Sequence, residues 1–330
     1  MLRVFRWIVL ALLFAIGGVA ALWAIGAVHF DFPWQSLRVS ASIVLALVFA
    51  ATLISIRGVW RKLAALVAVF GIVLAWWLTL KPSNEGNWQP DVAQLARAEV
   101  DGDVVTLHNV RNFDYRSEND YTPRWETRRV RLSQITGIDL ALNYWGSPWM
   151  AHPILSFQFA DAPPVCFSIE TRKKVGQSYS AIGGLYRQFS LIFIIAEERD
   201  VIRVRTNYRK GEDVYLYRTT ITPAGARERF LQYVRSVNGI NDKPRWYNAI
   251  TTNCTTAIRH QHPASERMGW NWRLLLNGKA DELMYERDAI VTSGLPFAEL
   301  KQRALINSAA KAANDAPDFS ARIRAGRPGM

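Results

Sequence analysis

Three long apolar runs open the chain, and they cover Trp7–Val28, Val39–Ile56 and Leu63–Leu80. Each is close to the ~20 residues that a helix needs to cross about 30 Å of hydrocarbon. Two further runs follow the first at once, and no small-residue cleavage site precedes Asp31, so the first run indicates an anchor rather than a signal peptide. We therefore expect a membrane anchor of three transmembrane helices over 1–81, followed by a linker over 82–91.

Basic residues near the ends of these runs set the expected orientation. Arg3 and Arg6 precede the first run, and Arg57, Arg61 and Lys62 lie between the second and the third. Since cytoplasmic loops are rich in Lys and Arg, these ends face the cytoplasm, and three crossings carry the rest of the chain outside. We expect a protein of the bacterial inner membrane whose soluble domain faces the periplasm.

The pattern after the linker is typical of a sheet followed by a helix. Short β-type runs are predicted at Val104–Asn112, Thr127–Leu132, Ile154–Phe159, Val165–Thr171, Leu191–Ala196, Val201–Thr206 and Asp213–Arg218. Thr222 and Pro223 then open a helix whose apolar residues recur at helical spacing until Asn238-Gly239 ends it. These patterns predict one α+β domain over 92–310 and a flexible Pro-, Arg- and Gly-rich tail over 311–330.

The charge of the chain changes this picture little. Its formal net charge of +12 suits either nucleic acid or a membrane surface. A domain in the periplasm meets anionic phospholipid headgroups, so we expect a membrane partner and no nucleic acid. The alternative is that the Lys and Arg side chains are simply a solvated face.

Cys254 is the candidate nucleophile. It follows Asn253 where a polar turn runs into an amphipathic stretch, a pattern that predicts the start of a helix. A helix N-terminus and a nearby imidazole lower the pKa of a thiol from about 8.5, so that thiolate forms at neutral pH. The alternative for a lone cysteine in a helix is an inert small hydrophobe. A disulfide with Cys166, the other cysteine of the sequence, would silence the thiol, but no spacing rule favours that pairing.

His152 is the candidate base among five histidines. A hairpin between the two neighbouring β-type runs places it opposite a position around Glu170 to Arg172, so the carboxylate of Glu170 would be near enough to hold the ring in the productive tautomer. His260 and His262 follow Cys254 by more than a helical turn, and their spacing suits no zinc site, so we expect no metal and no cofactor. The sequence has no Gly-rich phosphate loop and no Gly-x-Ser-x-Gly elbow, which argues against nucleotide enzymes and serine hydrolases.

The order of motifs gives a family resemblance. The motifs are Val110-Arg-Asn-Phe-Asp-Tyr115, His152, Phe167-Ser-Ile-Glu-Thr-Arg172 and Asn253-Cys-Thr-Thr256. Over roughly Val92–Ala310 this order resembles the N-terminal periplasmic domain of the lipoprotein N-acyltransferase Lnb. The resemblance implies a papain-like α+β fold in a permuted arrangement and a Cys-His acyltransferase. It matches Cys254 to the nucleophile, His152 to the base and Glu170 to the orienting carboxylate.

The expected function is transfer of an acyl chain from a phospholipid donor, through a thioester, to the amine of a lipoprotein acceptor. In the family the membrane helices follow the domain, whereas here three precede it, so the resemblance carries catalytic residues better than a substrate. Two other functions stay open. One is a cell-wall amidase or endopeptidase that uses the same thiol with water as acceptor, and the other is a non-enzymatic membrane assembly factor.

Overall fold

The computed structural model describes residues 2–250, 273 and 277–330. The chain divides into two compact units. The first, here called the membrane unit, contains Met1–Ser83, Ser178–Ser190 and Trp246–Ala249. The second, here called the sheet unit, contains Asn84–Gln177, Leu191–Arg245 and Ile250–Met330. Two short segments from the middle of the sequence therefore belong with the N-terminal helices rather than with the sheet.

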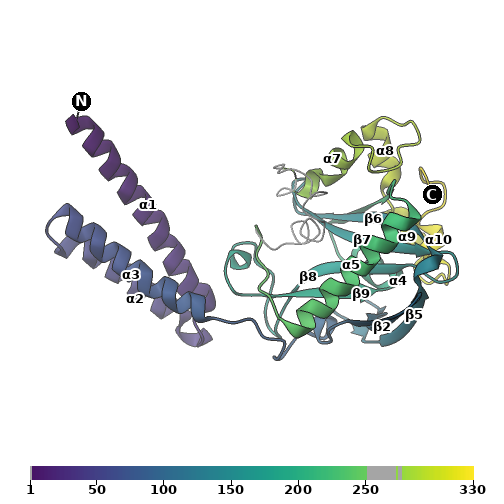
Figure 1. Cartoon of the computed structure of the whole chain (residues 1–330), viewed down its shortest axis with the longest axis horizontal. Helices are drawn as coiled ribbons and strands as arrows, with labels where there is room; N and C mark the ends of the chain where they lie inside the picture. Colours follow the sequence, from purple (N-terminus) through teal and green to yellow (C-terminus); the bar gives the residue numbers. More distant parts are fainter. Residues whose placement is uncertain (1, 251–272, 274–276) are drawn as a thin grey trace. The chain divides into compact units, whose positions relative to one another are not determined.

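The membrane unit is built on α1 (Leu2–Asp31), α2 (Arg38–Ser55) and α3 (Val59–Thr79), drawn in purple and blue in Figure 1. All three are long and apolar enough to cross a membrane, which confirms the three predicted spans. Ala24 and Ala27 are fully buried, as expected for small residues that let helices approach closely. Leu22 and Ile54 are 71% and 82% exposed, as suits side chains that face lipid.

The sheet unit contains an eight-stranded sheet, and its mixture with helices confirms the predicted α+β class (Figure 1). The strands follow the order β1, β2, β9, β8, β7, β6, β10, and β5 also pairs with β2. Their bounds are Arg97–Asp101 (β1), Val104–Arg111 (β2), Trp125–Arg131 (β5), Ile135–Trp145 (β6), Ala151–Phe159 (β7), Val165–Arg172 (β8), Ser190–Ala196 (β9) and Glu212–Arg218 (β10). A small separate pair joins β3 (Asp114–Tyr115) and β4 (Tyr121–Thr122).

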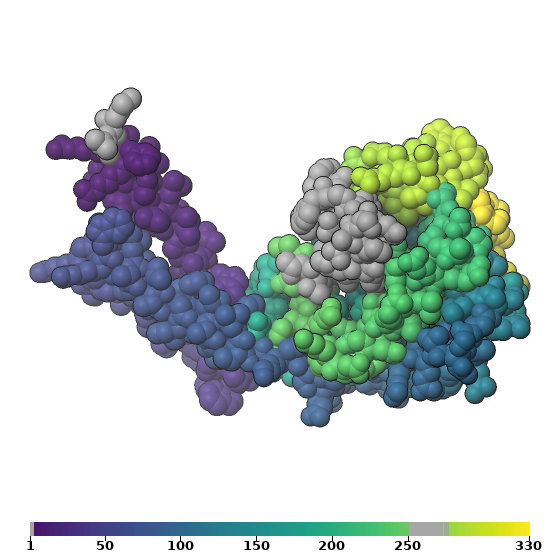
Figure 2. All heavy atoms as spheres, viewed as in Figure 1, coloured from purple at the N-terminus to yellow at the C-terminus, as the bar shows by residue number. Residues whose placement is uncertain are grey.

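Helices cover both faces of this sheet. They are α4 (Glu198–Val201), the π-helix η5 (Val204–Tyr208), α5 (Pro223–Asp242), α7 (Ala280–Glu286), α8 (Phe297–Ala304), α9 (Asn307–Ala312) and α10 (Phe319–Arg322). On one face α5 sets Phe230 edge-on against Phe157 and Phe167, with ring centroids 5.1 and 5.5 Å apart. The green atoms of α5 run along the side of the unit seen in Figure 2.

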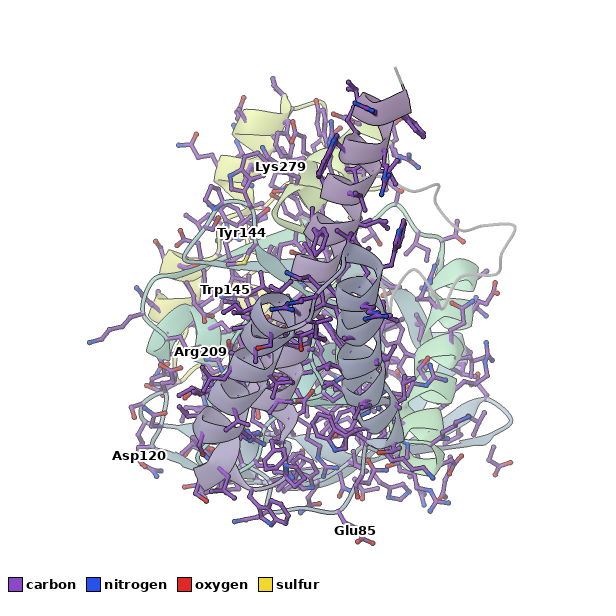
Figure 3. The ribbon with its side chains drawn as sticks, turned by 90° about the vertical axis from the view of Figure 1, so that its left-hand side faces the viewer. Glu85, Asp120, Tyr144, Trp145, Arg209 and Lys279 are labelled. Carbon is purple, nitrogen blue, oxygen red and sulfur yellow. The ribbon has the colours of Figure 1, made fainter. Side chains whose placement is uncertain are left out.

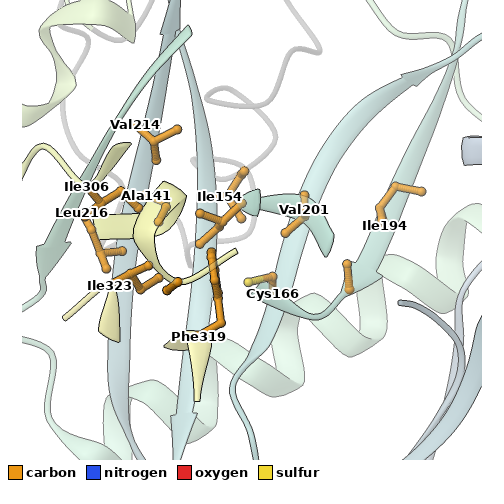
Figure 4. Packing of buried hydrophobic residues seen from close by; sticks show 14 of the residues in the cluster. Ala141, Ile154, Cys166, Ile194, Val201, Val214, Leu216, Ile306, Phe319 and Ile323 are labelled. Atoms are coloured by element: carbon orange, nitrogen blue, oxygen red, sulfur yellow. The ribbon is translucent and has the colours of Figure 1, made fainter. Parts of the chain in front are cut away.

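The opposite face carries the other part of the core. Ile154 and Cys166 of the central strands are fully buried there against Val201, Phe319 and Ile323 (Figure 4). The alternation of side chains along β7 explains why the core has a part on each face of the sheet. Ile154 and Phe157 lie an odd number of residues apart and therefore point to opposite faces. His152 lies two residues before Ile154 and therefore shares its face.

Helix α5 begins where the sequence predicts. Thr222 accepts a hydrogen bond from the Gly225 N–H (3.2 Å), and Pro223 occupies the first turn. The helix continues to Asp242, past the predicted end at Asn238-Gly239. Tertiary contacts explain the extension, because Asn238 exchanges two hydrogen bonds with the Ala98 backbone of edge strand β1 (3.0 and 2.8 Å).

Two expectations from the sequence are wrong. The predicted strand Val201–Thr206 is instead the end of α4 followed by η5. Its apparent alternation came from Arg203 and Arg205, which are both buried and paired with acids rather than exposed. The tail over 311–330 is not a flexible end either, since Phe319 and Ile323 are 1% and 0% exposed in the core. Its composition concealed a short helix that places these two apolar residues inside.

Candidate active site

The hairpin formed by β7 and β8 brings two of the predicted site residues together. The pair is antiparallel, with Ile154 opposite Ser168, which confirms the predicted hairpin. Continuing this register by two residues puts His152 opposite Glu170. The two side chains lie on one face because paired residues of neighbouring strands point to the same side.

A serine links the two residues. Nε2 of His152 lies 2.7 Å from Oγ of Ser168, and Oγ of Ser168 donates to Oε1 of Glu170 at 2.8 Å. Sequence reasoning did not select Ser168. It precedes Glu170 by two residues on the same strand, so the period of two was the signal that places it on the same face.

Arg205 holds the carboxylate of Glu170 in its ionised form. Its Nη2 donates to Oε1 of Glu170 at 3.0 Å. Burial opposes the charged form of Glu170, but the positive charges of Arg205 and Arg111 outweigh it and hold the pKa of Glu170 well below its usual range. An ionised carboxylate has no hydrogen to donate, so Glu170 acts only as an acceptor.

The direction of these hydrogen bonds fixes the tautomer of His152. The hydroxyl hydrogen of Ser168 is used in the bond to Glu170, so Oγ of Ser168 accepts from Nε2–H of His152. The lone pair of the ring is then on Nδ1, which has no hydrogen-bond partner among the residues that the structure describes. The hydrogen of the neutral ring is therefore assigned to Nε2.

Electrostatics keep the imidazole of His152 neutral. Burial and the charge of Arg205 lower the pKa of His152 from 6.5 to about 3, although Glu170 acts in the opposite direction. A neutral imidazole can accept a proton, although a pKa this far below neutral makes it a weak base.

The chain was also compared with known proteins. Residues 121–277 match the family model of the Lnb N-terminal periplasmic domain. The match confirms the resemblance noted in the sequence, and the matched region includes His152, Ser168, Glu170 and position 254. It starts after the Val110–Tyr115 motif and is shorter than the expected Val92–Ala310. Comparison with curated proteins and with solved structures gave no match. With its three apolar helices, the chain is a membrane protein with a periplasmic domain.

A second row of interacting polar side chains flanks His152 within the matched residues 121–277. Asn143 on β6 pairs with His152, and its Nδ2 donates to Oε2 of Glu212 at 2.7 Å. Glu212 in turn lies 3.6 Å from Nη1 of Arg209, which is labelled in Figure 3. Oδ1 of Asn143 is buried and accepts no hydrogen bond from the described part of the chain. His152 thus stands in a row of polar side chains that crosses the sheet.

Cys166 is not suited to chemistry. It is a free and fully buried thiol on β8, in the core of the sheet unit. Burial, with the nearby charge of Glu198, raises its pKa well above the usual range. A thiol of this kind stays protonated and acts as a small hydrophobe.

Cys254, the helix predicted from Asn253, His260 and His262 lie outside the described residues. The described chain that follows this segment lies beside the start of β7. Oδ1 of Asn277 accepts from the Ala151 N–H at 3.4 Å, and the Gly278 N–H donates to the Trp149 carbonyl at 3.1 Å. Figure 3 labels the neighbouring Tyr144 and Lys279. Asn277 and Gly278, which follow this segment in the sequence, therefore contact the residues that precede His152.

Proposed function

We propose that the periplasmic domain is a Cys-His acyltransferase with a permuted papain-like arrangement. Cys254 is the nucleophile, His152 the base, and Glu170 orients the imidazole through Ser168. The observation that carries the proposal is the relay from Nε2 of His152 through Ser168 to Glu170, at 2.7 and 2.8 Å. This relay leaves Nδ1 as the proton acceptor, which is what an adjacent thiol needs for activation.

In the first half-reaction, Nδ1 of His152 takes the proton of the Cys254 thiol. The thiolate attacks the carbonyl carbon of an acyl ester in a phospholipid, and the Cys254 backbone N–H stabilises the resulting oxyanion. The ester C–O bond then breaks, and the imidazolium returns its proton to the departing alkoxide. The products are a lysophospholipid and a thioester on Cys254.

In the second half-reaction, the α-amine of a lipid-modified N-terminal cysteine attacks the thioester. His152 removes a proton from the attacking nitrogen, the C–S bond breaks, and the proton passes to the departing thiolate. The products are an N-acylated lipoprotein and free enzyme, so no oxidant, metal or further reactant is consumed.

Two features support lipidic substrates. Trp149 and Met150, shortly before His152, are 46% and 40% exposed, so large apolar side chains face outward next to the base. In addition, Trp246–Ala249 belongs to the membrane unit. The described chain that leads toward position 254 therefore belongs to the part of the molecule that carries the membrane helices.

The test is the intact mass of the purified full chain after incubation with a phospholipid. We expect wild type and Cys166→Ala to gain the mass of one acyl chain, removable by hydroxylamine, and Cys254→Ala to gain none. Cys166→Ala is the matched control because Cys166 is buried and free. No adduct on a reduced Cys254 would contradict the lipid acyl-donor mechanism.

The same preparation separates the competing functions. Release of peptide from peptidoglycan fragments that depends on Cys254 would indicate a cell-wall hydrolase with water as acceptor. A Cys254→Ala variant with full cellular activity would indicate a non-enzymatic assembly factor.

A further inference from the structure

The loop Ser178–Ser190 is fastened to the outer ends of two membrane helices. The Arg187 N–H donates to Oδ2 of Asp31, the last residue of α1, at 3.0 Å. The Arg187 side chain donates from Nη1 to the Leu80 carbonyl at 2.6 Å, and its guanidinium lies 3.9 Å from the centre of a Trp77 ring. Arg187 thus joins the end of α1 through its backbone N–H and the end of α3 through its side chain.

Tyr186 attaches the loop to residues of α1 that lie before the end of that helix. Its ring stacks on Phe30, with centroids 5.0 Å apart, and lies 6.2 Å from the ring of Trp23. A Cβ atom on Gly26 would lie 2.0 Å from Oη of Tyr186, so the absence of a side chain there makes room for the tyrosine. Gly26 lies five residues before the end of α1, which is about 7.5 Å along the helix axis. The loop therefore reaches the level of the membrane-spanning segment itself.

The loop also carries apolar side chains that the described protein leaves uncovered. Ile182 is 63% exposed and Tyr179 is 44% exposed. Leu185, three residues after Ile182, packs into the apolar cluster of the membrane helices. Trp34, which follows α1, is 64% exposed, as expected for an indole at the headgroup level. The loop therefore carries exposed apolar side chains close in sequence to a residue that packs on the membrane-spanning helices.

We propose that Ser178–Ser190 is an interfacial loop that inserts into the outer leaflet of the membrane, with Ile182 in contact with lipid. The occupant of this surface is the bilayer, because Tyr186 and Arg187 attach the loop to helices that themselves span it. This inference does not depend on the chemistry proposed for Cys254 and His152.

The loop also holds the chain that leads to Cys254. The Tyr247 N–H donates to the Phe189 carbonyl at 2.9 Å, and the Ala249 N–H donates to the Gly184 carbonyl at 2.8 Å. Trp246–Ala249 therefore runs along the interfacial loop and is fixed at the same level. Trp246–Ala249, which precede the proposed nucleophile in the sequence, therefore lie at the membrane surface with the loop.

A nitroxide at position 182 tests the insertion. Ile182→Cys is labelled in a Cys254→Ala background, where Cys166 is buried and protected from the reagent. The full chain is placed in vesicles of phosphatidylethanolamine and phosphatidylglycerol, and collisions with oxygen and with a water-soluble nickel chelate are compared. We expect the label to collide more often with oxygen than with the nickel chelate. Val100→Cys, at an exposed position of β1, is the water-facing control. Equal access of the nickel chelate at both positions would overturn the proposal.

A pair of glycine variants tests the attachment. Gly26→Leu places a side chain where Tyr186 lies, whereas Gly18→Leu on the same helix meets nothing within 4 Å. We expect Gly26→Leu to raise the nickel access of the label at position 182 several-fold, and Gly18→Leu to leave it unchanged. A label at Leu22→Cys, on the lipid-facing side of α1, checks that the helix stays inserted in both variants. An unchanged label at position 182 in Gly26→Leu would show that Tyr186 does not hold the loop.

Discussion

Arg205 and Glu170 form an ion pair of 3.0 Å whose side chains are 4% and 15% exposed. Arg205 also donates from Nη1 to the Val201 carbonyl at 2.7 Å, which fixes the guanidinium to α4. The carboxylate opposite it is therefore held in one place and one charge state. Because Glu170 accepts from Ser168, the ion pair sets the direction of every hydrogen bond that leads to His152.

Removing one partner of this pair should destabilise the domain strongly. Arg205→Met leaves the carboxylate of Glu170 buried without its counter-charge, and we expect the free energy of unfolding to fall by about 3–5 kcal/mol. The double variant Arg205→Met/Glu170→Gln, which removes both charges, should recover most of this loss. Denaturant unfolding of the purified full chain, followed by circular dichroism, measures both. Equal stability of the single and double variants would show that the two charges do not interact.

Ser168→Ala should weaken the base without unfolding the domain. The variant removes the acceptor of Nε2–H, so the imidazole loses the bond that selects its tautomer and orientation. A hydrogen bond of this kind contributes about 1–1.5 kcal/mol, which corresponds to a fall of roughly tenfold in the rate of thioester formation. Ser133→Ala is the matched control, because Ser133 donates to Asp103 at an exposed site away from His152. Equal rates in the two variants would mean that the relay does not act on catalysis.

Acid should destabilise the fold through His152. Burial and Arg205 lower its pKa from 6.5 to about 3, so between these values the unfolded chain binds a proton that the folded chain does not. Stability is then lost as pH falls through this window. Glu170, whose folded pKa is depressed, contributes stability above its unfolded pKa of about 4.3 and loses it only at lower pH. The range from about pH 7 to about pH 5 therefore separates the contribution of His152 from that of Glu170.

The measurement is the unfolding temperature of wild type and His152→Asn at both ends of this range. We expect a larger fall on acidification in wild type than in the variant, because asparagine does not titrate. An equal fall of the unfolding temperature in wild type and variant would show that the imidazole of His152 is equally easy to protonate in the folded and unfolded chains.

The sequence predicted the parts of the site that depend on local pattern. The hairpin follows from two β-type runs around a Pro-containing loop, and its register follows from counting residues about the turn. His152 and Glu170 were therefore found as a pair. Ser168 was missed because a serine in an apolar strand does not by itself indicate a role in a site. Its spacing of two residues from Glu170 becomes informative only once the roles of the neighbouring residues are known.

Longer-range partners were beyond this kind of reasoning. Arg205 lies 35 residues from Glu170, and the nearby Arg203 pairs with Asp114. The burial of these two arginine side chains therefore does not follow from the local alternation of the sequence. The same holds for the tail, where Arg324 reaches Asp139 and Glu198 across the sequence. The helix predicted to begin at Asn253 lies outside the described residues and stays a prediction.

Asn238→Ala should loosen the edge of the sheet. Asn238 accepts from the Ala98 N–H at 3.0 Å and donates to the Ala98 carbonyl at 2.8 Å, so it takes the place of a neighbouring strand along β1. We expect a loss of about 1–3 kcal/mol and faster hydrogen exchange at the Ala98 amide. Arg235→Ala, at an exposed position of the same helix, should change neither quantity. Unaltered exchange at Ala98 in the Asn238 variant would contradict this role.

Phe319→Ala tests whether the end of the chain is part of the core. The composition of residues 311–330 favours a flexible segment, in which this substitution would have no effect on stability. Phe319 is instead 1% exposed and packs in the same cluster as Ile154, so we expect a loss of about 3–5 kcal/mol from the cavity that alanine leaves. Arg322→Ala is the control, since that side chain is 54% exposed and its ion pair with Asp318 contributes at most about 1 kcal/mol. Because Ile154 lies two residues from His152 on the same face, the Phe319 variant should also slow thioester formation, whereas the Arg322 variant should not.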